Sequence, residues 1–330
     1  MPPPLPVVRH GQLYEPRRYP DVKDPSLVFD GNRWHLFGTG CGVPGGTEVL
    51  HLWAPSVAGP WREERPPLLR GVPHIRSPAA PGVVAEGARF HLFLQHGFNV
   101  LGGRIEHLVS DDGGETFVRS GRGLGSSIGP REAGIYDPDA IEIDDGLYLT
   151  YAAMSVVAQP DLYLARSRSG SWDGPWKRVG RILGHADVPF HNQIGRPGYE
   201  WGLEGPQLLA VPEAGLVLLT AVCFFADRPA GHRQRLLLAA AERVTGPYRV
   251  LGPAVEPSSP GGRGENGHGF AVLDDGLVHL LYQERAGEGF PWRYMRATVE
   301  PAALAERWSD AGAQPPPGRD GQAEERNSIW

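Results

Sequence analysis

One short phrase recurs five times along this chain of 330 residues, and it limits the folds that the chain can adopt. Each copy consists of an apolar strand, a turn built on an acidic residue and glycine, and a second apolar strand. The copies begin near residues 24, 80, 137, 204 and 268, at intervals of 56 to 67 residues. Asp-Gly between apolar runs is a strong hairpin signal, because glycine accepts the positive φ of such turns.

A third apolar strand follows each hairpin, and three units continue into an outer strand that opens on Gly-Pro-aromatic: Gly59-Pro60-Trp61, Gly174-Pro175-Trp176 and Gly246-Pro247-Tyr248. Four strands per unit, repeated radially, predict the blades of a propeller. Two stacked sandwiches are the rival, but they would not require the same hairpin five times in the same order. We therefore predict an all-β fold, a five-bladed β-propeller with four antiparallel strands per blade.

We predict a single propeller domain over residues 1–310, with a boundary before a C-terminal tail. Its five blades are expected at approximately 20–70, 77–122, 134–182, 203–252 and 266–300. A short helix is expected from Pro301, because proline is favoured in the first turn of a helix. Residues 311–330 are polar and rich in proline and glycine, which predicts a flexible tail.

Composition and charge exclude several classes of function. The hydrophobic fraction of 41% is that of a folded chain, so the 45 glycines and 33 prolines indicate many tight turns. A net charge of −6 argues against nucleic-acid binding, which needs a concentrated basic face. No apolar segment predicts a membrane span, and the N-terminus lacks the regions of a secretion signal. With only Cys41 and Cys223, no disulfide framework is expected, and we predict a cytoplasmic protein.

Three acidic residues stand where repeated units begin: Asp24 and Asp137 before prolines, and Glu204 in Glu-Gly-Pro. The inner strands of a propeller surround its axis, so these matching positions of blades one, three and four should share one axial pocket. A lone Asp-Pro is more often a turn initiator than a catalytic group. Three acids at matching positions are harder to explain as turn residues, because like charges in a desolvated hollow raise one another's pKa and reduce the stability of the fold. The pattern therefore predicts a catalytic site.

Glycoside hydrolysis uses such an arrangement of acids. One protonated carboxyl group gives its proton to the leaving oxygen, while a carboxylate activates water or attacks the sugar directly. A third acid can keep the pKa of the donor high and hold it in orientation.

In these phrases the chain resembles the five-bladed glycoside hydrolases of family 43, and more loosely the wider group of families 32, 62, 68, 117 and 130. The resemblance covers roughly residues 20–300. It implies that Asp24 in "KDPSLV" is the general base, Asp137 in "YDPDAI" tunes the acid, and Glu204 in "LEGPQLL" is the general acid. It also implies inversion at the anomeric carbon, with base and acid roughly 6.5–9.5 Å apart. No cofactor is required.

The resemblance further assigns two residues of the last blade. His268 in "NGHGFAVLDDG" matches a histidine that holds an axial calcium through its shell, which implies a structural calcium on the propeller axis. A hydrogen bond from His268 to axial water is the alternative. Arg285 in "LLYQER" matches an arginine and is assigned to substrate binding. Three histidines in second strands are interpreted as packing residues: His35, His91 and His279.

Loops before the inner strands should overhang the acids and contact the substrate. We assign His74, Arg131, Tyr136 and Trp201 to this role, because sugars are held by aromatic faces and planar hydrogen-bonding groups. Packing between blades is the alternative for Tyr136 and Trp201. The expected partner is a small-molecule glycoside or oligosaccharide, with no nucleic acid and no membrane.

Two other functions stay open beside an inverting glycosidase. The phrase Ala79-Ala80-Pro81 lacks the tryptophan that is frequent in blade two of the family. A pocket adapted to other acid/base chemistry, such as cyclisation, elimination or isomerisation of a specialised metabolite, is therefore the second hypothesis. The third is a propeller that only binds a carbohydrate, against which the presence of all three acids argues.

Overall fold

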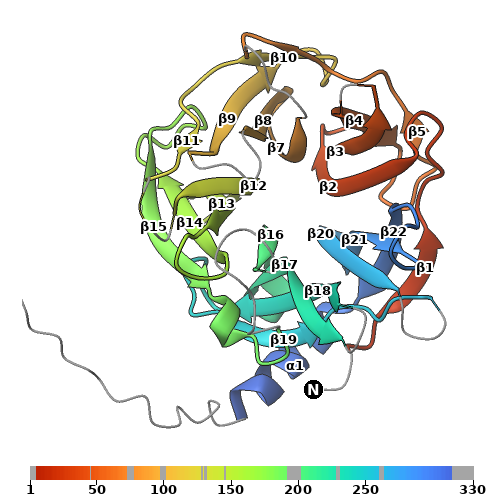
Figure 1. Cartoon of the computed structure of the whole chain (residues 1–330), viewed down its shortest axis with the longest axis vertical. Helices are drawn as coiled ribbons and strands as arrows, with labels where there is room; N and C mark the ends of the chain where they lie inside the picture. Colours follow the sequence, from red (N-terminus) through yellow and green to blue (C-terminus); the bar gives the residue numbers. More distant parts are fainter. Residues whose placement is uncertain are drawn as a thin grey trace, which may run out of the picture.

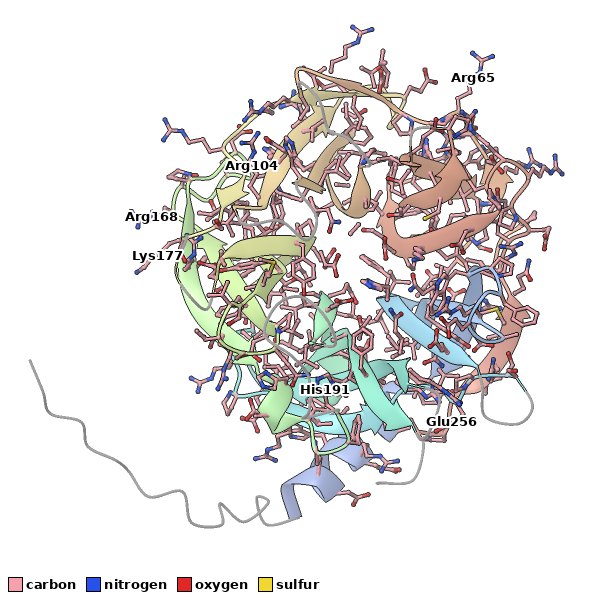
Figure 2. All side chains as sticks on the ribbon, in the orientation of Figure 1. Arg65, Arg104, Arg168, Lys177, His191 and Glu256 are labelled. Atoms are coloured by element: carbon pink, nitrogen blue, oxygen red, sulfur yellow. The ribbon has the colours of Figure 1, made fainter. Side chains whose placement is uncertain are left out.

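The computed structural model describes residues 5–44, 46–72, 78–96, 102–127, 129, 132–144, 146–191, 202–227, 231–259 and 264–313. Within these residues the strands form five sheets, which stand as blades around a central axis (Figure 1). The innermost strands β2, β7, β12, β16 and β20 surround that axis, and charged side chains such as Arg65 and Lys177 lie on the outer rim (Figure 2). The prediction of a five-bladed propeller is confirmed.

The blades follow one another along the chain. Blade one contains β2 (Asp21–Phe29), β3 (Trp34–Val43), β4 (Gly46–Ala54) and β5 (Arg62–Glu63). Blade two contains β7 (Ala79–Glu86), β8 (Arg89–His96), β9 (Arg104–Ser110) and β10 (Thr116–Arg119), with β6 (Leu68–Arg70) and β11 (Leu124–Gly125) added. Blade three contains β12 (Gly134–Ile143), β13 (Gly146–Met154), β14 (Asp161–Ser167) and β15 (Trp176–Leu183). Blade four contains β16 (Glu204–Val211), β17 (Leu216–Asp227), β18 (Gly231–Ala241) and β19 (Arg249–Pro253). Blade five contains β20 (Glu265–Asp274), β21 (Leu277–Arg285), β22 (Arg293–Val299) and β1 (Val8–Gln12).

Strand β1 closes the ring, because the N-terminal strand pairs antiparallel with β22 and becomes the outer strand of the last blade. Strand β6 falls inside the range predicted for blade one, yet it pairs in parallel with β10 of blade two. Short 3-10 turns lie at His185–Asp187 and Pro212–Ala214.

The helix α1 (Pro301–Ala313) starts where expected and runs three residues into the predicted tail, whose remainder lies outside the described residues. Its buried Leu304 joins an apolar cluster with strands of blades four and five, so α1 packs on the rim beside β19 (Figure 1). In the part of the chain that is described, no helix combines the length and apolar character needed to cross a membrane. Cys41 and Cys223 are both free thiols.

Each inner strand carries a β-bulge at the same height. One extra residue interrupts the pairing register between the following pairs of positions: Lys23 and Ser26, Ala79 and Gly82, Tyr136 and Asp139, Glu204 and Gln207, and Gly267 and Gly269. In four blades a proline falls inside the bulge, where the ladder needs no N–H donor. The bulges therefore explain why Asp-Pro, Ala-Pro and Gly-Pro recur in the inner strands.

Two buried chains of hydrogen-bonding groups repeat in blades one and two. His35 Nε2 lies 2.9 Å from Asp30 Oδ2, and His35 Nδ1 lies 2.9 Å from His51 Nε2. His91 and His107 repeat the arrangement in blade two, with 3.0 Å between Nδ1 and Nε2. One neutral tautomer satisfies the first chain: His35 Nε2–H donates to Asp30, and His35 Nδ1 accepts a hydrogen bond from His51 Nε2–H.

These histidines are packed in the protein as neutral rings. The burial of His35, His91 and His279 confirms their interpretation as packing residues. Burial lowers the pKa of His51 to about 3 and the pKa of His107 to about 4. Because the folded pKa lies below the unfolded value of about 6.5, each neutral ring stabilises the fold above pH 6.5 and loses that contribution as the pH falls.

We predict that His51→Gln reduces the loss of stability on acidification. At pH 5 the unfolded wild-type His51 binds a proton that the folded ring excludes, which costs about 2 kcal/mol. The free energy of unfolding, measured with urea at pH 7.5 and pH 5, should therefore fall by about 2 kcal/mol less in the variant. Between pH 7.5 and pH 8.5, where this histidine is neutral in both states, the two proteins should change alike. An equal loss between pH 7.5 and pH 5 would contradict the prediction.

Candidate active site

The bulges of blades one and three place two carboxyl groups on the axis. Asp24 and Asp137 are the bulge residues, and they adopt left-handed backbone conformations with φ of 54° and 49°. Aspartate tolerates this region better than most residues, although the conformation costs about 1 kcal/mol. The two acids were expected at the beginnings of their strands, but β2 and β12 each start three residues earlier. The bulge, rather than the strand end, therefore turns these side chains toward the axis.

Glu204 does not occupy the position of the two aspartates, which corrects the expectation of three matching acids. Gly205 holds the bulge position of blade four, with φ of 55°, and Glu204 is the paired residue before it. A side chain on Gly205 would collide with His268, because its Cβ would stand 2.5 Å from Nδ1. Blade four therefore has glycine at the bulge, and the longer glutamate side chain reaches the axis from one residue earlier.

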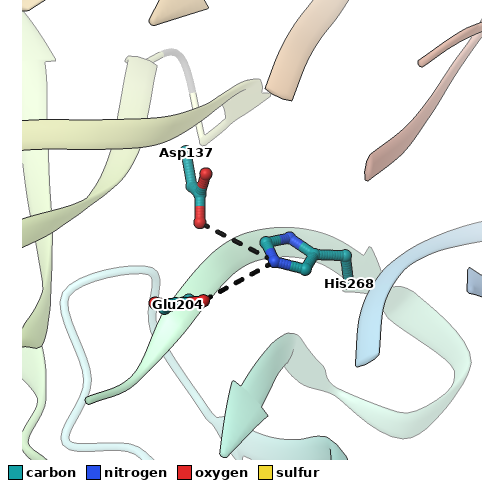
Figure 3. A group of neighbouring side chains, drawn as sticks. All are labelled: Asp137, Glu204 and His268. Carbon is teal, nitrogen blue, oxygen red and sulfur yellow. Dashed lines mark ion pairs between the residues drawn. The ribbon is translucent and has the colours of Figure 1, made fainter. Parts of the chain in front are cut away.

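The three carboxyl groups surround one imidazole ring. Asp24 Oδ1 lies 3.3 Å from His268 Nδ1, on one edge of the ring. On the other edge, Nε2 lies 3.9 Å from Asp137 Oδ2 and 3.8 Å from Glu204 Oε2, as Figure 3 shows. Residues from blades one, three, four and five therefore meet at a single point, although the sequence separates the outermost two by more than 200 positions.

The electrostatics of this cluster are strongly coupled. Burial, together with the neighbouring Glu204 and Asp24, raises the pKa of Asp137 to about 7 against the opposing effects of His268 and the Gly205 N–H group. Burial alone would lower the pKa of His268, but Asp24, Asp137 and Glu204 outweigh it and raise that pKa to about 9. The ring is therefore an imidazolium at neutral pH, while Asp137 titrates near neutrality. Such perturbed groups in one hollow are typical of catalytic sites.

A cavity of about 30 Å³ continues from this cluster along the axis, which is room for about one water molecule. It is lined by residues of the inner strands, among them Ser26, Ala80, Asp139, Gln207 and Phe270. The carboxyl group of Asp139 is buried, and its Oδ1 has no hydrogen-bond partner among the described residues. Burial raises the pKa of Asp139 well above its usual value.

The cluster fits a calcium ion poorly. Ligand atoms of Asp137, Glu204 and His268 lie within 4.8 Å of one another. Calcium takes six to eight oxygen ligands, whereas this set supplies one nitrogen, and that nitrogen belongs to a ring that is protonated at neutral pH. An axial calcium would have to bind His268 through water, as the resemblance implies.

The remaining predicted residues lie in different places. Tyr136 is 2% exposed and packs in the apolar core between blades three and four, so its placement argues for the packing alternative. Arg285, at the end of β21, pairs with Glu265 at 2.5 Å between Nε and Oε2 and stacks on Trp292. It is not among the residues that line the axial cavity. Three predicted residues, His74, Arg131 and Trp201, lie outside the described residues.

Two groups of residues in or beside the axial site were not predicted from the sequence. Asp139 and Ala80 line the cavity beside the acids, and Gln95 and Gln283 contact the backbone of the bulges. The register of Asp-Pro, Ala-Pro, Asp-Pro and Gly-Pro could have identified Ala80 as an axial residue. Nothing in the sequence marks the two glutamines, because their neighbours come from the adjacent blade.

No protein-family model matches the sequence, and the curated proteins contain no significant match to it. Solved structures, by contrast, share its fold. The catalytic domain of a GH62 α-L-arabinofuranosidase from Coprinopsis cinerea is similar with a TM-score of 0.63 at 16% identity, covering 90% of this chain and 98% of that one. An endo-arabinase from Bacteroides thetaiotaomicron VPI-5482 has a TM-score of 0.62 at 14% identity, covering 86% and 98%.

An α-L-arabinanase from Cellvibrio cellulosa, solved in complex with arabinohexaose, has a TM-score of 0.61 at 17% identity, covering 84% of this chain and 91% of that one. All three similar structures are glycoside hydrolases by their names. At these identities the similarity establishes the fold. The resemblance noted in the sequence to five-bladed glycoside hydrolases is therefore confirmed at the level of the propeller.

We predict that Gly205→Ala destabilises the protein and displaces His268. Alanine in the left-handed region costs about 1–2 kcal/mol, and the overlap of its Cβ with the imidazole adds roughly 1–3 kcal/mol. Gly215→Ala is the matched control, because Gly215 has φ of 64° and open space around it. Urea unfolding should show the larger loss in Gly205→Ala, and a crystal structure should show a moved ring. Equal losses in the two variants would contradict this account.

Proposed function

We propose that this protein is a glycosidase that cleaves a small glycoside or oligosaccharide with inversion at the anomeric carbon. The observation that supports this best is the convergence of Asp24, Asp137 and Glu204 on one buried imidazolium. The fold shared with arabinose-releasing and arabinan-cleaving hydrolases supports the same reaction class.

In this proposal Glu204 protonates the departing oxygen and Asp24 activates the attacking water. The two carboxyl groups approach opposite edges of His268, with contacts of 3.3 and 3.8 Å to its two nitrogens. Different nitrogens of the ring therefore face the two acids, and the proposal requires roughly 6.5–9.5 Å between their carboxyl groups, as in inverting enzymes. A retaining enzyme needs a closer pair, about 5–5.5 Å apart.

In this proposal Asp137 supports Glu204, and His268 supports Asp24. Asp137 titrates near neutral pH, and its Oδ2 accepts a hydrogen bond from Gly205 N–H at 3.1 Å, directly beside Glu204. It can thus hold the segment that carries the proposed acid and influence its charge. His268 Nδ1 lies 3.3 Å from Asp24 Oδ1, so the ring can hold the proposed base in place.

The sugar that fits this proposal best is a pentose such as arabinose. The similar structures are named for arabinofuranoside and arabinan cleavage, and one of them holds arabinohexaose. Among the described residues of blade two, Ala80 and Pro81 line the cavity, so the polar side chains that line it come from the other blades.

We predict that Glu204→Gln and Asp24→Asn both lose activity, and that they differ in their dependence on the leaving group. Removal of a general acid or base costs roughly 10²–10⁴-fold in rate. A 4-nitrophenyl arabinoside needs little protonation of its leaving oxygen, so Glu204→Gln should be far less impaired on it than on an alkyl arabinoside. Asp24→Asn should be impaired equally on both substrates. Steady-state kcat on the two glycosides measures the difference.

The exposed turn residue Glu213 provides the control for this comparison. It belongs to the same blade and lies in a 3-10 turn at the far end of β16, so Glu213→Gln should retain full activity. If Glu204→Gln and Asp24→Asn hydrolyse both glycosides as fast as the wild type, the proposed chemistry is wrong.

We predict that the first product formed has the opposite anomeric configuration to the substrate. Proton NMR of the anomeric region during hydrolysis distinguishes the two anomers before mutarotation mixes them. Product of retained configuration would show that one carboxylate attacks the sugar directly, which the ring between the two acids does not favour.

A further inference from the structure

The bulges leave backbone N–H groups that the sheet ladder does not use, and two buried glutamines accept them. Asp24 N–H donates to Gln283 Oε1 at 3.0 Å, and Asp137 N–H donates to Gln95 Oε1 at 3.0 Å. Both glutamines are almost fully buried. A buried N–H group without a partner is costly. These two bonds therefore stabilise the left-handed backbone conformations of Asp24 and Asp137.

The two glutamines occupy equivalent positions, one blade before the aspartate that each contacts. Each lies on a second strand, β8 or β21, at the pair directly before the bulge, opposite Ala79 or Gly267. Thr39 holds the same position on β3, and its Oγ1 accepts the N–H of Ala80 at 2.8 Å. The same bond between neighbouring blades therefore occurs three times. In two cases it contacts a bulge that carries an aspartate, and in the third, at Ala80, it contacts a bulge without an acid.

The peptide group before Asp24 is fixed from both sides by blade five. Gln283 accepts its N–H, and the hydroxyl group of Tyr294 donates to its carbonyl oxygen, that of Lys23, at 2.6 Å. Gly38 makes room for this hydroxyl group, since a Cβ there would stand 1.9 Å from it. The plane of this peptide determines the direction of the Asp24 Cα–Cβ bond, and hence the line along which its carboxyl group points.

The orientation of the Gln283 amide is also determined. Its Nε2 faces Gln234 Oε1 at 3.4 Å, so its oxygen is turned to Asp24. Gly267 leaves space for Gln234, because a Cβ at that position would approach the Gln234 oxygen to 2.6 Å. A chain of side chains from blade four through blade five thus ends on the backbone of Asp24 in blade one.

We infer that Gln283 and Gln95 are positioning residues, which hold the backbone of Asp24 and Asp137 so that both carboxyl groups point at His268. The predicted effect of the two glutamines on turnover rests on the proposed function, whereas their contacts with the backbone do not. Thr39 makes the same bond for a bulge that carries no acid, so its loss should affect the fold without affecting the chemistry. Misplacement of a reacting group by 1 Å can cost about 10²-fold in rate.

The test compares Gln283→Met, Gln95→Met and Thr39→Val, which remove the acceptor at three equivalent positions. We expect Gln283→Met to lower kcat by about 10- to 100-fold with KM nearly unchanged, because the base is displaced while the binding surface stays. Gln95→Met should likewise lower kcat. Thr39→Val should keep the kcat of the wild type while its melting temperature falls as much as theirs. Equal kcat in all three variants and the wild type would overturn the inference.

Gln283→Glu tests the acceptor alone: its oxygen can accept from Asp24 N–H but a carboxylate cannot donate to Gln234 as Nε2 does, so it should recover only part of the kcat lost in Gln283→Met. A second measurement needs neither activity nor a variant. In the wild type, hydrogen exchange followed by NMR should show the Asp24 and Asp137 amides protected as strongly as ladder amides, and rapid exchange would overturn the inference. If the wild type hydrolyses no glycoside while these amides are protected, the proposed function fails and the positioning role stands.

Discussion

The positive charge of His268 is the interaction on which the site depends. Three carboxyl groups packed into a buried hollow repel one another, and burial makes each charge more costly. An attraction between unit charges at about 4 Å is worth about 4 kcal/mol at the effective dielectric of a protein site. His268 has three carboxyl neighbours, at 3.3, 3.8 and 3.9 Å, and together they outweigh the effect of burial and raise the pKa of His268 to about 9. Because His268 opposes the rise in the pKa of Asp137, removing the ring would raise that pKa further.

Backbone geometry, more than side-chain identity, brings these groups together. The same bulge recurs at one height in all five inner strands, and according to the blade it carries an aspartate, an alanine, a glycine or, in blade five, His268. Asp24 and Asp137 supply acids at this position, Ala80 leaves it apolar, and Gly205 leaves space for His268. A propeller can thus carry chemistry on some blades and keep the others for packing without any change in strand pairing.

The sequence predicted the ring and the acids because both leave local signals. Asp-Gly between apolar runs predicts a hairpin from a few neighbouring residues. Asp-Pro and Glu-Gly-Pro likewise indicate the inner strands from short local motifs. The sequence did not predict that Glu204 lies one residue before the bulge, because the register of a strand is set by its partner. It did not predict that β6 pairs with β10, and it could not decide between substrate contact and interblade packing for Tyr136, since both depend on packing between blades. The glutamines behind the aspartates belong to this class as well.

The junction of blades five and one carries part of the candidate site and is also the place where the ring of blades is closed. Asp24 and His268 face each other across this junction, and no direct strand pairing joins β2 to β20. The chain itself provides the link, because β1 completes blade five and continues through residues 13–20 into β2 of blade one. Leu13 N–H donates to the Tyr294 carbonyl, while the Tyr294 hydroxyl group donates to Lys23. Closing the ring with the N-terminal strand therefore also helps to hold the two halves of the charged cluster together, because the Tyr294 hydroxyl group contacts the peptide group directly before Asp24.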